Sequence, residues 1–169
     1  MGRFDSVPDI EGRLDDFEIQ CITDWLGDPV RNFLDQSIEK DVFEPYENGQ
    51  YCDSLIRLGT CISAVLLKMI STKCPLKNMP SPKKVSGGWL LDLKPFREIC
   101  LLREFKKCFK ERIPNQLIED IHVIQKLRNA YAHRLTPIQD IFGDEHKTIL
   151  KALRDTWQDL RNEYVKIVF

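Results

Sequence analysis

The chain has 169 residues, of which 43% are hydrophobic, and a formal net charge of −1, so it can form one compact domain with a core of its own. It contains no apolar run long enough to cross a bilayer, and its acidic first residues do not resemble a secretory signal, which predicts a soluble, cytoplasmic protein without a membrane partner. The near-zero net charge argues against a protein that coats nucleic acid nonspecifically.

The charges are divided unevenly along the chain. Residues 1–50 hold 13 of the 26 acidic residues and 4 of the 25 basic ones, so this part carries 4 − 13 = −9, and the remainder carries 21 − 13 = +8. The division predicts either a basic surface for an anionic ligand in the later residues or ordinary solvated helix faces.

Two helices are predicted in the acidic part. The first covers residues 9–25, and the second covers residues 29–43 and ends before Pro45, because proline interrupts a helix. Asn48 and Gly49 then indicate a turn.

The most apolar helix is expected over residues 50–72. Its apolar side chains recur at spacings of three and four, which is typical of a helix with one buried face. These residues are Leu55, Leu58, Ile62, Val65, Leu66 and Met69. We expect this helix at the centre of a bundle, where its polar Ser54, Arg57 and Thr60 could face the helix that follows Pro114.

A segment at about residues 74–88 contains three prolines and two glycines, which exclude a helix. We expect an exposed, mobile loop with solvated lysines, and contact of these lysines with a phosphate backbone is the alternative. Residues 89–93 would be a short helical or extended piece that returns to the core. No convincing β alternation occurs in the chain.

Pro95 can open a further helix that is expected to end at about Arg112. Its inner side is apolar and its outer side is the most basic part of the chain. The basic residues are Arg97, Arg103, Lys106, Lys107, Lys110 and Arg112. If RNA binds the protein, we expect Lys106, Lys107 and Lys110 to contact phosphates without reading the base sequence.

Residues 115–133 predict the helix that carries the candidate site. Its apolar stripe consists of Leu117, Ile121, Ile124 and Tyr131. Arg128 falls within this stripe, where the pattern favours leucine. A buried guanidinium keeps its charge, so it needs a carboxylate, a phosphate or a neighbouring subunit to compensate for its desolvation. His122 and His146 lack partners at a useful spacing and are left out of the chemistry.

The run from Arg128 to His133, Arg-Asn-Ala-Tyr-Ala-His, resembles the Arg-polar-x-x-x-His motif of the HEPN superfamily. The resemblance implies an all-α bundle of five or six helices and a metal-independent endoribonuclease that acts as a homodimer, with two motifs facing each other. It also implies that His133 exchanges the proton, that Arg128 binds the phosphate and that Asn129 orients one of these groups or the 2′-hydroxyl.

The chemistry of metal-free RNA cleavage fits these residue types. A base must deprotonate the 2′-hydroxyl, donors must stabilise the charged phosphorane, and an acid must protonate the leaving oxygen. One motif has too few groups, and a second copy in a symmetric dimer would supply the missing acid or base. The product would carry a 2′,3′-cyclic phosphate. Lys126 and Arg134 are further candidate phosphate contacts, and Tyr131 either stacks on a base or fills the core.

Other interpretations stay open at this point. Arg128 could pair with a buried carboxylate while Asn129 caps or bridges and His133 satisfies the end of its helix. The chain would then be a non-catalytic HEPN module that binds RNA or a regulatory protein partner in a defence, toxin-antitoxin or RNA-processing system. No phosphate-binding glycine loop, Gly-x-Ser-x-Gly or Cys-His signature indicates another enzyme class.

A last helix, starting near Asp144, is expected to close one HEPN-like domain over residues 1–169. The six cysteines include no Cys-x-x-Cys pair and no histidine at ligand spacing, so we predict no metal and no cofactor. We expect these cysteines to be small buried residues in a reducing compartment, without a disulfide framework.

Overall fold

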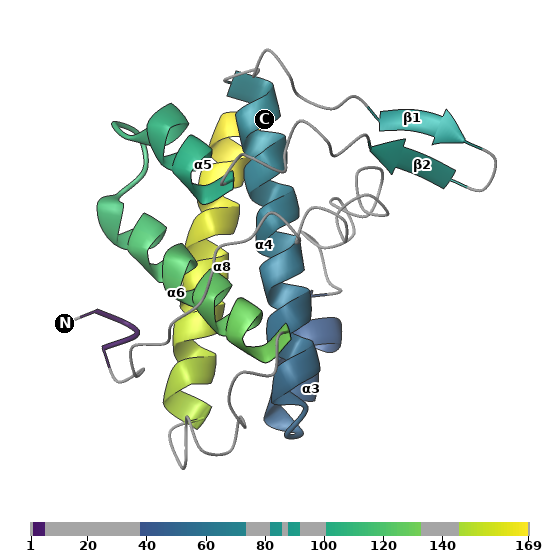
Figure 1. Ribbon diagram of the computed structural model, residues 1–169. Helices are drawn as coiled ribbons and strands as arrows, with labels where there is room; N and C mark the ends of the chain where they lie inside the picture. Colours follow the sequence, from purple (N-terminus) through teal and green to yellow (C-terminus); the bar gives the residue numbers. More distant parts are fainter. Residues whose placement is uncertain are drawn as a thin grey trace.

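The computed structural model describes residues 2–5, 38–73, 82–85, 88–91, 101–132 and 146–168. The helices in these ranges pack into an all-α bundle, as predicted from the sequence, and one short β-hairpin projects from it (Figure 1). The helix predicted over residues 9–25 and most of the one predicted over 29–43 lie outside the described residues.

The central element is α4 (Tyr51–Lys73), which contacts every other described helix. All six apolar residues that define its predicted buried face are at most 2% exposed. The prediction of a central helix over residues 50–72 is therefore confirmed, and its bounds agree within one residue. Burial of this apolar face supplies the hydrophobic free energy that holds the bundle together.

The segment before α4 differs from its prediction. A π-helical turn, η3 (Glu39–Phe43), runs directly into α3 (Glu44–Glu47), so the helical region does not end before Pro45. Pro45 lies in the first turn of α3, where a missing backbone N–H is tolerated. The predicted turn follows, and Gly49 adopts a φ of 87°, a conformation that favours glycine.

The proline-rich segment contains a strand that the sequence did not predict, and the residues after it take the extended form that was one of the two alternatives for residues 89–93. β1 (Pro82–Val85) pairs antiparallel with β2 (Gly88–Leu91), in a register that sets Pro82 opposite Leu91 and Val85 opposite Gly88. Such a hairpin depends on a short glycine-containing connection, so it needs no long amphipathic alternation that a sequence pattern could reveal. Residues 82–85 and Gly88 thus form strands within the predicted loop, and residues 74–81 and 86–87 lie outside the described residues.

Three further helices surround α4. They are α5 (Leu101–Phe109), α6 (Asn115–Ala132) and α8 (His146–Val168). Figure 1 shows α4 and α8 running alongside each other while α6 crosses them obliquely, and α6 packs against both. In α8 the apolar residues at spacings of three and four are buried, namely Ile149, Leu153, Trp157, Leu160, Tyr164 and Ile167.

The helix predicted to end at about Arg112 ends earlier. Arg112 N and Ile113 N both donate to Phe109 O at 3.0 Å, which closes α5 in a turn. Pro114 disfavours the helical conformation for Ile113, so the chain must leave the helix before it begins α6.

No helix within the described ranges is long and apolar enough to cross a membrane.

Candidate functional site at the α4–α6 interface

Arg128 lies on the buried face of α6. Its side chain is 2% exposed and is among the largest fully buried side chains of the described residues. It follows Leu117, Ile121 and Ile124, which are also buried, along the same face of the helix. The helical periodicity therefore places the guanidinium of Arg128 on the same buried face as these three apolar side chains.

Gly59 of α4 makes room for the stem of Arg128. A Cβ atom at Gly59 would lie 2.4 Å from Arg128 Cγ, 2.8 Å from its Cβ and 3.2 Å from its Cδ. Two of these separations are shorter than any real contact between carbon atoms, so a side chain at Gly59 and the present Arg128 cannot coexist. α4 and α6 can approach this closely because residue 59 is a glycine, which has no side chain to meet Arg128.

Asn129 holds the guanidinium from the adjacent position. Arg128 Nη1 donates a hydrogen bond of 2.8 Å to Asn129 Oδ1, and Asn129 is 1% exposed. A hydrogen bond from a charged donor is stronger than one between neutral groups, and it fixes the orientation of the guanidinium. Because the amide is neutral, this contact does not cancel the positive charge.

Gln125 joins α6 to α4 one helical turn before Asn129. Its Nε2 donates to Ser63 Oγ at 2.9 Å and to Gly59 O at 3.4 Å. Both side chains are buried. Gly59, Ser63, Gln125, Arg128 and Asn129 form one set of buried polar contacts between the two helices, which we call the polar layer.

The polar residues expected to face α6 do not make these contacts. Ser54 Oγ donates to Gln50 O at 2.7 Å and Thr60 Oγ1 donates to Ile56 O at 2.9 Å, so both hydroxyls are used within α4. Arg57 is exposed. The contacts with the polar residues of α6 come instead from Gly59 and Ser63.

The structure brings together two of the three predicted catalytic residues. Arg128 and Asn129 are in contact. His133 and Arg134 come directly after α6 and lie outside the described residues, as does the side chain of Tyr131. Sequence reasoning did not find Gly59 or Ser63, because a glycine and a serine inside an apolar helix carry no signal until the helix that crosses them is known.

The predicted phosphate contacts fall on two helices. Lys106, Lys107 and Lys110 are exposed on α5, and Lys126 is half-buried on α6. Lys107 Nζ lies 3.5 Å from Glu104 Oε1 within the same helix. None of these lysines belongs to the polar layer.

His122, which sequence reasoning left out, lies half-buried on α6 near lysines from both helices. Its pKa is lowered, first by burial of the imidazole and then by the charge of Lys126, with a smaller contribution from Lys106. The negative charge of Glu119 raises the pKa of His122 and so opposes the other effects.

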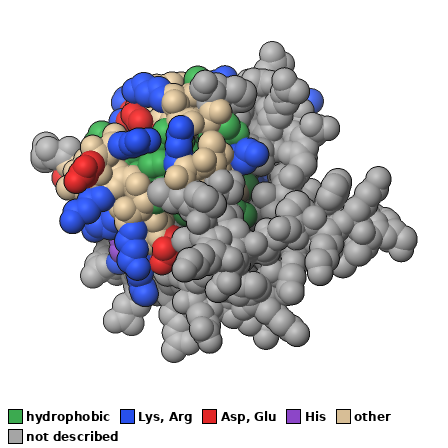
Figure 2. Space-filling view, turned by 90° about the horizontal axis from the view of Figure 1, so that it is seen from above, with side chains coloured by type: hydrophobic (Ala, Val, Ile, Leu, Met, Phe, Trp, Pro, Cys, Tyr) green, Lys and Arg blue, Asp and Glu red, His purple; other side chains and the backbone are tan. Residues whose placement is uncertain are grey.

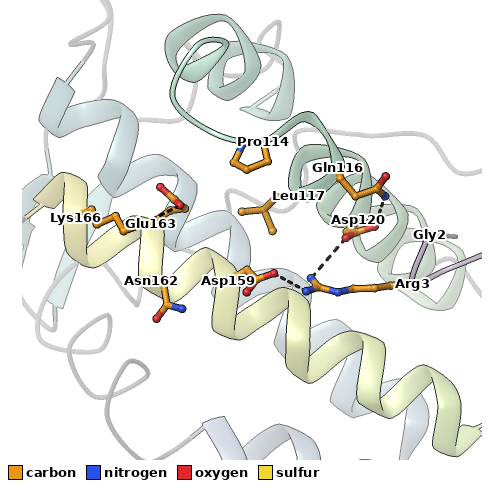
Figure 3. Close-up of a pocket in the computed structure, with 10 residues that line it drawn as sticks. All are labelled: Gly2, Arg3, Pro114, Gln116, Leu117, Asp120, Asp159, Asn162, Glu163 and Lys166. Carbon is orange, nitrogen blue, oxygen red and sulfur yellow. Dashed lines mark hydrogen bonds and ion pairs between the residues drawn. The ribbon is translucent and has the colours of Figure 1, made fainter.

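A second polar cluster lies at the start of α6 and opens into a cavity of about 570 Å³ (Figure 3). Gln116 Nε2 donates to Asp120 Oδ1 at 3.0 Å, and Arg3 Nη1 lies 3.6 Å from Asp120 Oδ2. Arg3 Nη2 also lies 2.5 Å from Asp159 Oδ2 on α8. The pKa of Asp120 is raised, mainly because its carboxyl is desolvated.

The cysteines only partly follow their prediction. Cys61 is buried and free, and burial raises the pKa of its thiol. Cys52 is half-buried and is not disulfide-bonded. Cys108 is disulfide-bonded, so the expectation of reduced cysteines fails at this position. Sequence spacing alone does not show which cysteines meet in the fold.

Within the described ranges, no group of three or more His, Cys, Asp or Glu side chains could hold a metal ion.

Comparison with known proteins identifies no relative. No family model, curated protein or solved structure matches the chain. The resemblance to HEPN proteins consequently still depends on the motif between Arg128 and His133.

Proposed function

We propose that this chain is a HEPN-type endoribonuclease that cleaves RNA without a metal ion and acts as a homodimer. The observation that carries the proposal is the buried Arg128 of α6, which is hydrogen-bonded to Asn129 and precedes His133 by five positions in the sequence.

The position of Arg128 is hard to explain by packing. A buried ionic group is often replaced by apolar residues of similar volume without loss of stability, because desolvation of the charge offsets its favourable contacts. Leucine would suit the apolar stripe of α6 and would carry no charge to desolvate. Buried charged groups of this kind are candidates for functional sites.

Each motif residue has a role in the proposed reaction. The planar guanidinium of Arg128 binds two phosphate oxygens and stabilises the phosphorane as negative charge develops on it. Asn129 is a positioning residue, because its 2.8 Å hydrogen bond sets the orientation of that guanidinium. His133 exchanges a proton with the 2′-hydroxyl or the leaving oxygen, and the second motif of the dimer provides the other acid or base.

Burial of Arg128 sets a condition on this mechanism. With 2% of the side chain exposed, phosphate cannot reach the guanidinium in the conformation described. The active enzyme must therefore adopt a conformation in which Arg128 is accessible, and the apparent affinity for RNA is reduced by the fraction of molecules in that conformation.

The same burial favours a second candidate function. If Arg128 and Asn129 stay inside the protomer, they serve the α4–α6 interface, and the chain is a non-catalytic module that binds RNA or a protein partner. The two candidates differ in whether the motif is needed for RNA cleavage.

The test is cleavage of total RNA by purified protein in the presence of a chelator. We expect the wild-type protein to cleave RNA, with loss of activity by a factor of at least about 100 in both Arg128→Ala and His133→Ala, because each removes a group of the transition state. Lys151→Ala is the control, since Lys151 is exposed on α8 and pairs with Asp155 of the same helix. Heterodimers that combine Arg128→Ala and His133→Ala subunits should recover part of the activity if the two residues act from opposite subunits.

Equal cleavage by the wild-type protein and both motif variants would contradict the proposal, since it would come from a contaminating nuclease. The complete absence of cleavage by a folded dimer, together with retained RNA or protein binding, would establish the second candidate.

A further inference from the structure

Gln125 ties α6 to α4 at the point where Arg128 crosses. Its side-chain amide donates to Ser63 Oγ at 2.9 Å and to Gly59 O at 3.4 Å, and Gln125 and Ser63 are 3% and 0% exposed. Gly59 is also the residue against which the stem of Arg128 lies. One residue of α4 therefore contacts the amide of Gln125 through its carbonyl and the buried arginine through the space that a side chain would fill.

The contacts of Gln125 and the burial of Arg128 depend on the same placement of α6. Three residues of an α-helix turn through about 300°, so the two side chains point within about 60° of each other. The Cβ, Cγ and Cδ atoms of Arg128 lie along Gly59, and a movement of α6 that draws this stem away from α4 also draws the Gln125 amide away from its two acceptors. Exposure of the guanidinium by such a movement therefore requires that both hydrogen bonds break.

The polar layer should separate at a lower cost than the apolar contacts beside it. When two apolar side chains part, both expose hydrophobic surface to water without compensation. When the Gln125 amide parts from Ser63 Oγ and Gly59 O, water replaces each lost hydrogen bond, so only the small net free energy of those bonds is lost. Such contacts favour one closed arrangement of α4 and α6 and still allow it to open reversibly.

We propose that the hydrogen bonds of Gln125 to Ser63 and Gly59 form a latch that keeps Arg128 buried, and that release of this latch makes the guanidinium accessible to a phosphate. The latch governs the exposure of Arg128 that cleavage requires, so RNA as the ligand rests on the proposed function.

Attraction of RNA to the protein does not require the latch to open. Figure 2 shows Lys and Arg side chains on the described part of the face seen from above, and three lysines are exposed on α5, namely Lys106, Lys107 and Lys110. Such cations attract a polyanion to the surface while Arg128 stays buried. Exposure of the guanidinium is therefore a separate step, which can be measured without RNA.

The test measures how fast the guanidinium of Arg128 reacts with phenylglyoxal, a reagent that modifies arginine side chains in contact with solvent. Labelling is followed over time by mass spectrometry of the peptide that contains Arg128, and the exposed Arg57 provides the reference. The variants are Ser63→Ala and Gln125→Met, which remove one and both of the hydrogen bonds. Ser54→Ala is the matched control, because Ser54 is a buried serine of the same helix whose hydroxyl donates within α4.

We expect Arg128 to be labelled about threefold to tenfold faster in Ser63→Ala than in the wild-type protein, as the loss of one hydrogen bond implies. Labelling of Arg128 in Gln125→Met should be faster still. Ser54→Ala should match the wild-type protein, and the labelling rate of Arg57 should be the same in all four proteins. Both latch variants should cleave limiting RNA in chelator faster, by the factor found for labelling, because a larger fraction of molecules exposes Arg128.

Equal labelling of Arg128 in the wild-type protein, Ser63→Ala and Gln125→Met would overturn the latch. Equal acceleration in Ser54→Ala would also overturn it, by assigning the effect to a general loosening of α4. Faster labelling with slower cleavage would do the same, since the hydrogen bonds would then belong to the active conformation. Faster labelling in both latch variants, with no cleavage by any of the proteins, would support the latch and count against the nuclease alone.

Discussion

The two ends of α6 each bury a charged side chain, and they accommodate it in different ways. Near the start, the Asp120 side chain is 4% exposed, accepts a hydrogen bond from Gln116 and lies near Arg3 of the N-terminal segment. Near the end, Arg128 packs its stem on Gly59 and donates to the neutral Asn129. The contacts of Asp120 thus include an opposite charge, and those of Arg128 include a neutral amide that orients the guanidinium.

The burial of Asp120 and the burial of Arg128 therefore differ in how far packing within the fold accounts for them. Asp120 lies in a network that links the N-terminal segment, α6 and α8, and it can lose its charge by binding a proton. An arginine cannot be neutralised in this way. Arg128 is therefore the group whose presence calls for a functional explanation.

The largest effect on stability should come from filling the space that Arg128 occupies. Gly59→Ala places a methyl group 2.4 Å from Arg128 Cγ and should lower the free energy of unfolding by about 1–3 kcal/mol, the usual range for overpacking. Urea unfolding followed by circular dichroism measures the change.

Arg128→Ala in the same background relieves most of this contact, because it removes the Cγ and Cδ atoms and leaves only the Cβ at 2.8 Å. The double variant should be more stable than the sum of the two single changes predicts, with a coupling of about 0.5–3 kcal/mol. Additive changes would mean that Gly59 and Arg128 do not share this space.

A smaller effect is expected at the opposite end of α6. Asp120→Asn keeps an oxygen that can accept from Gln116 but removes the carboxyl whose pKa is raised by desolvation. The native carboxyl holds its proton to a higher pH than the unfolded one, so the native state binds more protons between the two pKa values. Its contribution to the free energy of unfolding therefore falls as the pH rises above about 3.9, the pKa of an unfolded aspartate.

At about pH 3.5 the Asp120 carboxyl is mostly protonated in both the native and the unfolded wild-type protein. The difference in unfolding free energy between Asp120→Asn and the wild-type protein should therefore change in favour of the variant from about pH 3.5 to neutral pH. The measurement is urea unfolding of both proteins at the two pH values, which cancels the titration of the other carboxyl groups. The opposite trend would show that the ion pair with Arg3 outweighs desolvation.

The long helices could be predicted from the sequence because their signal is local. In α4 and α8 the apolar residues recur at the helical period, and each such residue is buried in the fold. The stripe of α6 likewise predicted that Arg128 lies among apolar residues. These inferences need only the spacing of residue types along one element.

Features that depend on contacts between elements could not be predicted in the same way. Gly59 acquires its role from Arg128, and His122 acquires its electrostatic environment partly from Lys106 on another helix. The disulfide of Cys108 and the β1–β2 hairpin also depend on which segments meet in space. A sequence pattern identifies the residue that is unusual, and the fold identifies the residues that act on it.

The most direct test of the central claim, that Arg128 serves chemistry and not packing, is the paired measurement of unfolding free energy and RNA cleavage for Arg128→Met. Methionine fills similar space without charge, so a functional arginine predicts a change in unfolding free energy of less than about 1 kcal/mol together with loss of chelator-resistant cleavage. A destabilisation of about 3–5 kcal/mol, the range expected when a buried ionic network is broken, with cleavage retained by the remaining folded protein, would contradict the account.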